Sequence, residues 1–195
     1  SEMKNKQLLC LCLLAWLFHS GIMAQYNWDY TITEGDEYND YIMAVDCDTN
    51  VNIYTTGIFQ DTVDFFGDTI ISMGHNDVFI SCLYPDGSLS WVITGGGDFE
   101  DAGIDLCISN EFVYVTGIFL AKYNPKFGFE WAKSYGGIGS DEALDIICDA
   151  DDNIILAGTF ENSISFGDKI LTSEGYDDGF MLKLNSDGEV KWAHH

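Results

Sequence analysis

Three versions of one phrase decide the fold of this chain: DYIMAVDCDTNVNIYTTGIF (40–59), DAGIDLCISNEFVYVTGIF (101–119) and DEALDIICDADDNIILAGTF (141–160). The first half of each phrase alternates apolar residues with small or acidic ones, which is the period of a half-buried strand. The second half is β-branched and aromatic and reaches Gly57, Gly117 or Gly158, so we expect a second strand that ends there. DCDTN (46–50) and DADDN (149–153) have the Asp and Asn content of a tight hairpin turn between the two strands.

A second phrase follows the first: VDFFGDTIISMGHNDVFISCLYPDGSLSW (63–91) is matched by ISFGDKILTSEGYDDGFMLKLNSDGEVKW (164–192). Each predicts a third strand, VFISCLY (78–84) or GFMLKLN (179–185), and then an Asp-Gly turn into a fourth strand that contains a Trp. No segment between the strands has a helical period. Four antiparallel strands per repeat predict an all-β fold made of propeller blades.

The middle repeat is shortened. Phe119 follows Gly117 after 2 positions, whereas the third repeat needs 22 positions from Gly158 to Phe180. We expect its second and third strands either to meet in a very short hairpin near Thr116-Gly117 or to fuse into one strand of a thinner blade. Three repeats are also fewer than the roughly 4–8 blades of closed propellers. The sequence therefore predicts a partial propeller of about three blades, which belongs to a longer protein or associates through its exposed blade faces.

The first 24 residues have the pattern of a secretory signal peptide. Lys4 and Lys6 precede an apolar run at 8–18, and Ala24 offers a cleavage site. Two extra residues, Ser1 and Glu2, precede Met3. The alternatives are an uncleaved amphipathic helix or membrane anchor, for which the run is short, and a lipoprotein at Cys10, which the preceding Leu disfavours. We expect a signal peptide at 1–24 and a propeller repeat domain at 25–195, secreted or at the cell surface, with no membrane span after cleavage.

The charge balance narrows the range of partners. The chain has 32 Asp and Glu residues, 8 Lys and no Arg, which gives a net charge of −24. Nucleic acid is not an expected partner, because a phosphate backbone is bound by clustered Lys and Arg. Hydrophobic residues make up 47% of the chain, which is enough to build a packed core.

No catalytic residue set is predicted. His75 is expected in an exposed loop, and no Ser-His-Asp order or phosphate-binding Gly loop is present. Asp105 and Asp145 occupy matched positions in the predicted innermost strands. Glycoside hydrolysis needs two carboxyl groups at a defined separation, but the simpler interpretation of this pair is hydrogen bonding to neighbouring backbone.

Two acidic turns are candidate calcium sites. Asp46, Asp48 and Asn50, and likewise Asp149, Asp151 and Asn153, offer spaced oxygen ligands. Neither turn continues into an EF-hand pattern, and turns rich in Asp and Asn have the same sequence pattern without binding an ion. Both interpretations stay open, and no other cofactor is predicted.

Four cysteines follow the signal segment: Cys47, Cys82, Cys107 and Cys148. Export permits disulfides, but Cys47 and Cys148 occupy the same position in different repeats and are expected to lie far apart in a propeller. We interpret the four mainly as small buried hydrophobic residues.

The order of Thr-Gly-x-Phe, Phe-Gly-Asp, Asp-x-Phe, Asp-Gly and Trp-Ala-Lys between Tyr26 and His195 resembles the bacterial SBBP-type β-propeller repeat. The resemblance implies an exported repeat protein without a catalytic residue set. We therefore expect a non-enzymatic module for protein or glycan interaction. The alternatives are a secreted propeller-type enzyme acting on glycans and a calcium-stabilised adhesin-like component.

Overall fold

The computed structural model describes residues 40–117, 119–126 and 128–195, and over these ranges the chain forms thirteen strands in three antiparallel sheets. The prediction of an all-β chain with one antiparallel sheet per repeat is confirmed. The predicted signal peptide (1–24) lies outside the described residues. Within the described ranges, no helix is long and apolar enough to cross a membrane.

The first sheet contains β1 (Tyr41–Cys47), β2 (Ile53–Phe65), β3 (Asp68–Leu83) and β4 (Leu89–Gly95), in that order. The strands β2 and β3 are much longer than the sequence predicted, because their ladder continues past Gly57 with one bulge and closes only at a two-residue turn. Both turn residues, Phe66 and Gly67, have positive φ (56° and 93°), which matches the twist of the strands on either side.

The third sheet repeats this plan with β10 (Asp141–Cys148), β11 (Ile154–Phe166), β12 (Lys169–Leu184) and β13 (Val190–His194). It adds a short fifth strand, β9 (Gly136–Ile138), which pairs with the outer half of β11. The long hairpin of β11 and β12 is therefore held at its edge by the segment that enters the sheet.

The second sheet is the short one, with β5 (Gly103–Ser109), β6 (Phe112–Gly117), β7 (Leu120–Asn124) and β8 (Gly128–Lys133). Of the two arrangements predicted for it, the short hairpin is the one found, because β6 and β7 pair as separate antiparallel strands. The Gly117 N–H donates to the Phe119 carbonyl at 3.0 Å and closes this hairpin.

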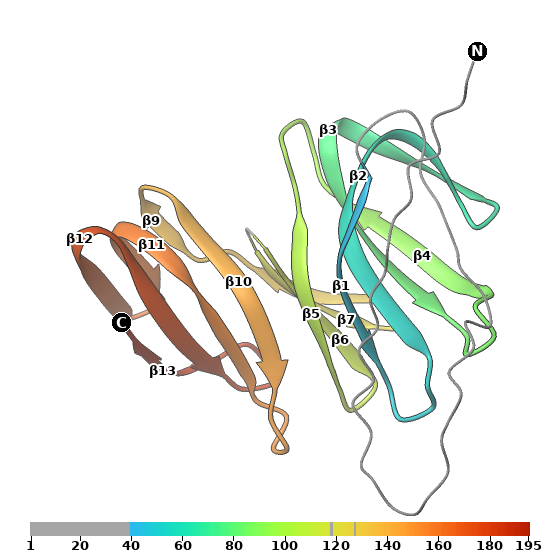
Figure 1. Ribbon diagram of the computed structural model, residues 1–195. Helices are drawn as coiled ribbons and strands as arrows, with labels where there is room; N and C mark the ends of the chain where they lie inside the picture. Colours follow the sequence, from blue (N-terminus) through green and yellow to red (C-terminus); the bar gives the residue numbers. More distant parts are fainter. Residues whose placement is uncertain (1–39, 118, 127) are drawn as a thin grey trace, which may run out of the picture.

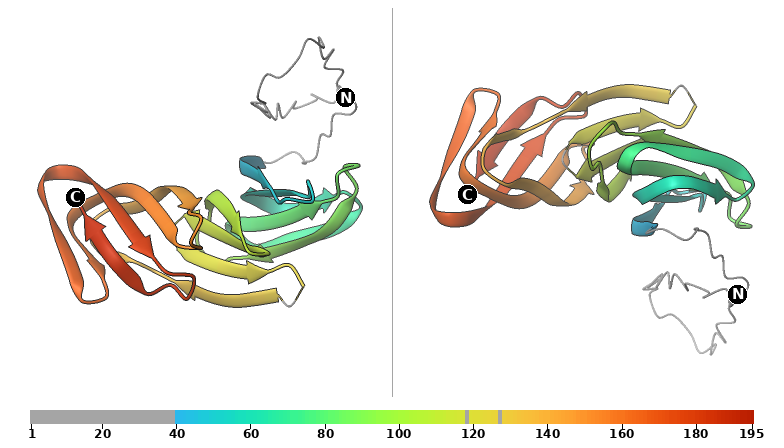
Figure 2. Two further views of the ribbon diagram at one scale, coloured as in Figure 1. Left: turned by 90° about the horizontal axis from the view of Figure 1, so that it is seen from below. Right: turned by 90° about the horizontal axis from the view of Figure 1, so that it is seen from above.

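The three sheets are stacked in a twisted row, with the second sheet in the middle (Figures 1 and 2). The first strands of the sheets adjoin one another, since β5 contacts both β1 and β10. One apolar cluster joins the first and second sheets and includes Ile80, Leu106 and Val113. Another joins the second and third sheets and includes Tyr114 and Leu156. Burial of these clusters stabilises the stack.

The glycine repeated at the centre of each phrase has a steric role. A Cβ atom at Gly57 or Gly158 would lie 1.8–2.1 Å from a carbonyl oxygen of the neighbouring first strand, and one at Gly117 would lie 2.1 Å from the Ala102 carbonyl oxygen just before β5. The sequence predicted that the second strand ends at this glycine, which is correct for Gly117 but wrong for the other two. There the glycine permits a close approach of two backbones inside a continuing strand.

Candidate functional site

The acidic turns after β1 and β10 use their first carboxylate as a backbone clamp. Asp48 Oδ1 accepts hydrogen bonds from the N–H groups of Asn50 and Asn52, at 2.8 and 2.9 Å. Asp149 Oδ1 accepts equivalent bonds from Asp151 and Asn153, both at 2.9 Å. These are the Asx turns that the sequence offered as the alternative to calcium ligands.

The remaining predicted calcium ligands are dispersed around these clamps. Asp46 lies on β1, where its Oδ1 accepts from the next N–H at 2.8 Å. Asn50 and Asp151 are exposed in their turns, whereas Asn153 is buried and donates its side-chain N–H groups to Asp149. Over the described ranges, no three His, Cys, Asp or Glu side chains converge to hold a metal ion.

Hydrogen bonds also lower the pKa values of the Asp48 and Asp149 carboxyl groups in these two turns. Lys183 donates to Asp149 Oδ2 at 2.6 Å, and this ion pair lowers the pKa of Asp149, with hydrogen bonds from Asn153 adding to the effect. At Asp48, burial opposes the change, but the hydrogen bonds from Asn52 and Asn50 still lower the pKa. Both carboxylates are therefore charged acceptors whose oxygens already face N–H donors.

Lysines concentrate at the junction of the second and third sheets. Lys122, which is buried, donates to the Ser186 carbonyl at 3.0 Å and lies 3.8 Å from the centre of the Phe112 ring. Lys133 donates to the Gly188 carbonyl in the same turn. These contacts connect the second sheet to the turn between β12 and β13, so part of the scarce positive charge has a structural role.

The matched pair Asp105 and Asp145 lies on β5 and β10, directly after a bulge in each strand. A bulge re-aims the side chain that follows it, and Asp105 Oδ2 accepts from the Ile146 N–H across the junction at 2.8 Å. Burial raises the pKa of Asp105 to about 6; the Ile146 N–H opposes this rise and the Asp145 carboxyl adds to it. The predicted hydrogen bonding of this pair to neighbouring backbone is confirmed for Asp105.

The same two strands carry a disulfide that the sequence interpretation missed. Cys107 and Cys148 are bonded, with their Cα atoms 5.9 Å apart. The interpretation of the four cysteines mainly as small buried hydrophobic residues is wrong for this pair. These two are offset by one position, and the adjacent first strands bring them together. Of the other cysteines, Cys82 is buried as predicted, whereas Cys47 is exposed.

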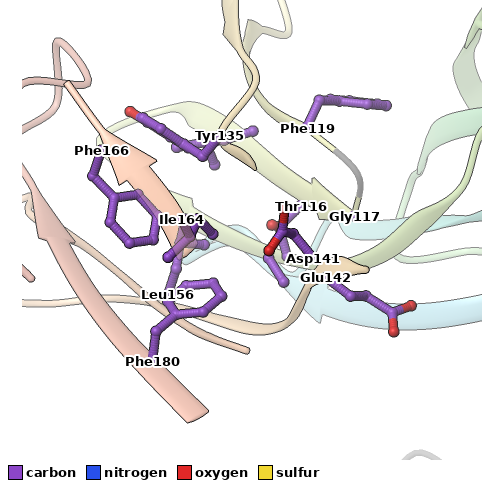
Figure 3. A pocket seen from close by; sticks show the side chains of 12 residues that line it. Thr116, Gly117, Phe119, Tyr135, Asp141, Glu142, Leu156, Ile164, Phe166 and Phe180 are labelled. Atoms are coloured by element: carbon purple, nitrogen blue, oxygen red, sulfur yellow. The ribbon is translucent and has the colours of Figure 1, made fainter. Parts of the chain in front are cut away.

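A small cavity of about 20 Å³ lies between the second and third sheets. Figure 3 shows Ile164, Phe166 and Phe180 filling one side of it, with Tyr135 above them. Thr116 and Asp141 lie on the opposite side (Figure 3). The Thr116 hydroxyl, the Tyr135 hydroxyl and Asp141 Oδ1 are buried without a hydrogen-bond partner among the described residues.

A much larger cleft, of about 370 Å³, lies between the first and second sheets. Its walls are mostly apolar and come from β3, β4, β7 and β8, while the segment 95–97 and Asp101 form its polar side. No sequence signal identified this cleft directly, but the missing residues of the middle repeat are its cause. His75 is not among the residues that line the cleft. It is exposed, as predicted, but it lies on β3 and not in a loop.

The sequence matches no protein-family model and no curated protein. The resemblance to the SBBP-type repeat consequently stays a prediction.

Proposed function

We propose that this chain is a secreted or cell-surface, non-enzymatic β-propeller repeat module for interaction with proteins or glycans, and part of a longer protein. The observation that carries the proposal is the stacking of repeated sheets face to face. The second sheet is covered on both sides, whereas the third sheet ends the stack with an exposed face. Met181 on that face is 50% exposed, although its counterpart Ile80 in the first sheet is buried at 4%.

Three further features support this proposal. A row of stacked antiparallel sheets, each with four strands in sequential order, is the arrangement that propeller blades adopt. The Cys107–Cys148 disulfide suits an oxidising compartment, as expected of an exported protein. The acidic side chains of the two turns after β1 and β10 accept backbone N–H groups, which supports a structural role for them and an interaction role for the loops and sheet faces.

An array of glycans and extracellular-matrix proteins, read with labelled full-length chain, tests the proposal. We expect binding to one class of ligand and no release of product when the same ligands are incubated with unlabelled chain. Turnover of a bound glycan would contradict the non-enzymatic assignment. Binding to nothing on the array would contradict the interaction module.

The Asp105 and Asp145 pair favours one second candidate, a propeller-type enzyme acting on glycans. Glycoside hydrolysis uses two carboxyl groups, one of which acts as an acid through a raised pKa. Burial raises the pKa of Asp105, and Asp145 lies next to it. Asp105→Asn and Asp145→Asn variants discriminate the candidates. Both should keep ligand binding under either hypothesis, but only the enzyme hypothesis predicts an activity for them to lose.

A further inference from the structure

The cleft between the first and second sheets has a filled counterpart one repeat further along. The cleft and the small cavity share four matched positions: Ile80 and Leu120, Gly95 and Tyr135, Asp101 and Asp141, and Phe119 and Phe180. The volume nevertheless rises from about 20 Å³ to about 370 Å³. The two spaces are therefore the same junction in two states of filling.

Two differences in sequence account for the extra volume. Tyr135, whose ring packs on Phe166 with centroids 5.4 Å apart, is replaced by Gly95 at the cleft. The outer half of β11, which carries Ile164 and Phe166, has no counterpart in the second sheet, where β6 ends at Gly117. What remains is an apolar space bounded by residues such as Val78, Ile93 and Phe129.

The cleft also retains the backbone edge that the missing strand would pair with. In the third sheet, Gly136–Ile138 pairs antiparallel with Ser163–Ser165. The matched segment of the second repeat is 96–98, and no strand in the described ranges pairs with it. Its shape is nevertheless held in the same way, because the Gly97 N–H donates to Asp101 at 3.0 Å as the Gly137 N–H does to Asp141 at 2.7 Å.

The glycine at this edge is informative. A Cβ atom at Gly137 would lie 1.6 Å from the Ser163 carbonyl oxygen, so the paired strand demands glycine there. At Gly97, no described atom lies within 4 Å of the same position, and φ is not in the left-handed region. A strand at this edge would need the glycine. The described residues leave that side of Gly97 open, while Gly74 of β3 lies against the Gly97 and Asp98 carbonyl oxygens.

The surroundings of the edge are acidic. Asp101 lines the cleft. Asp77 is 3% exposed, its Oδ1 has no partner among the described residues, and this atom would lie 2.2 Å from a Cβ at Gly96. At this edge, Asp77 and Asp101 would repel an acidic segment, such as most of those in a second copy of this chain with its net charge of −24, whereas Lys or Arg flanking an apolar segment would be attracted.

We propose that this cleft docks an extended segment of a partner protein, with large apolar residues at alternate positions and Lys or Arg at its flanks. The segment pairs its backbone with residues 96–98 and places two apolar side chains where Ile164 and Phe166 lie in the next repeat. This is strand addition to an open edge, in which main-chain hydrogen bonds contribute affinity and side-chain pockets contribute specificity. The proposal rests on the proposed function as an interaction module and names its partner class.

The probe is a fluorescein-labelled peptide that carries Asn-Ser-Ile-Ser-Phe-Gly, the sequence of residues 162–167, between two lysines on each side. Fluorescence anisotropy with the full-length chain should show saturable binding. Gly97→Val should weaken it at least about tenfold, because its side chain would occupy the path of the added strand. Gly175→Val is the matched control, since Gly175 is equally open and lies on the hairpin of the third sheet. It should bind like the unmodified chain.

Two control peptides test the chemistry of recognition. A peptide with Ile and Phe exchanged for Ser, or with the lysines exchanged for Glu, should bind at least about tenfold more weakly. Absence of saturable binding, or equal binding by the Gly97→Val variant, would overturn the docking site. If the peptide result fails in this way but the chain still binds a ligand on the array, the interaction module stands and only this cleft is refuted. If the peptide binds but the array is blank, the strand site stands without the broader function.

Discussion

Breaking the Cys107–Cys148 disulfide should destabilise the junction between the second and third sheets. The two cysteines are 41 residues apart in sequence, and a closed loop of this size limits the entropy of the unfolded chain. The loop-closure relation gives about 4 kcal/mol of stabilisation for it. For a domain of this size, we expect a fall of about 8–16 °C in the melting temperature.

The assay is thermal and urea unfolding followed by tryptophan fluorescence, with and without a phosphine reductant. The double variant Cys107→Ser and Cys148→Ser should resemble the reduced chain and should not respond to reductant. Cys82→Ser is the matched control, because Cys82 is buried but unbridged, so this variant should keep the full response to reductant. A response below about 1 kcal/mol in the unmodified chain, or an equal response in the double variant, would refute the reasoning.

Three further outcomes are expected. For Asp105, the folded-state pKa is raised by burial to about 6, so the folded chain holds this proton more tightly than the unfolded chain. Stability should fall as the pH rises from about 4 to about 6, by about 1 kcal/mol after solvent screening, and urea titrations of Asp105→Asn should lack this slope. Calcium at about 5 mM should leave the melting temperature unchanged, because the Asp48 and Asp149 oxygens already accept N–H donors; a rise of several degrees would restore the calcium interpretation. Met181→Lys, on the exposed face of the third sheet, should shift any self-association seen by sedimentation toward monomer, and an unmodified chain that stays monomeric at about 100 μM would contradict association through this face.

Local patterns were sufficient for the strands and turns, since these depend on neighbours in the sequence. The alternation of apolar residues gave the first strand of each sheet, and the Asp and Asn clusters gave the turns at 46–50 and 149–153. Strand ends were harder to place. The glycine at 57 interrupts the pattern, but in the structure it marks a close backbone contact within a strand that continues to Phe65.

The sites that depend on two repeats at once could not be predicted. The offset pair Cys107 and Cys148, and the hydrogen bond from Ile146 to Asp105, both require β5 and β10 to lie side by side. The order of residues within one repeat does not give the distance between strands of two different repeats. The sequence did indicate that the middle repeat lacks a hairpin, but the volume left behind depends on how far the first and second sheets remain apart.

The sequence by itself determined the all-β class, the number of antiparallel sheets and the short middle repeat, because strand period and turn chemistry are local properties of the chain. The tertiary structure alone decided which cysteines bond, which carboxyl group is partly buried and where an open edge remains. Those features arise where one sheet packs on the next, and the packing distance between sheets is set by many side chains acting together.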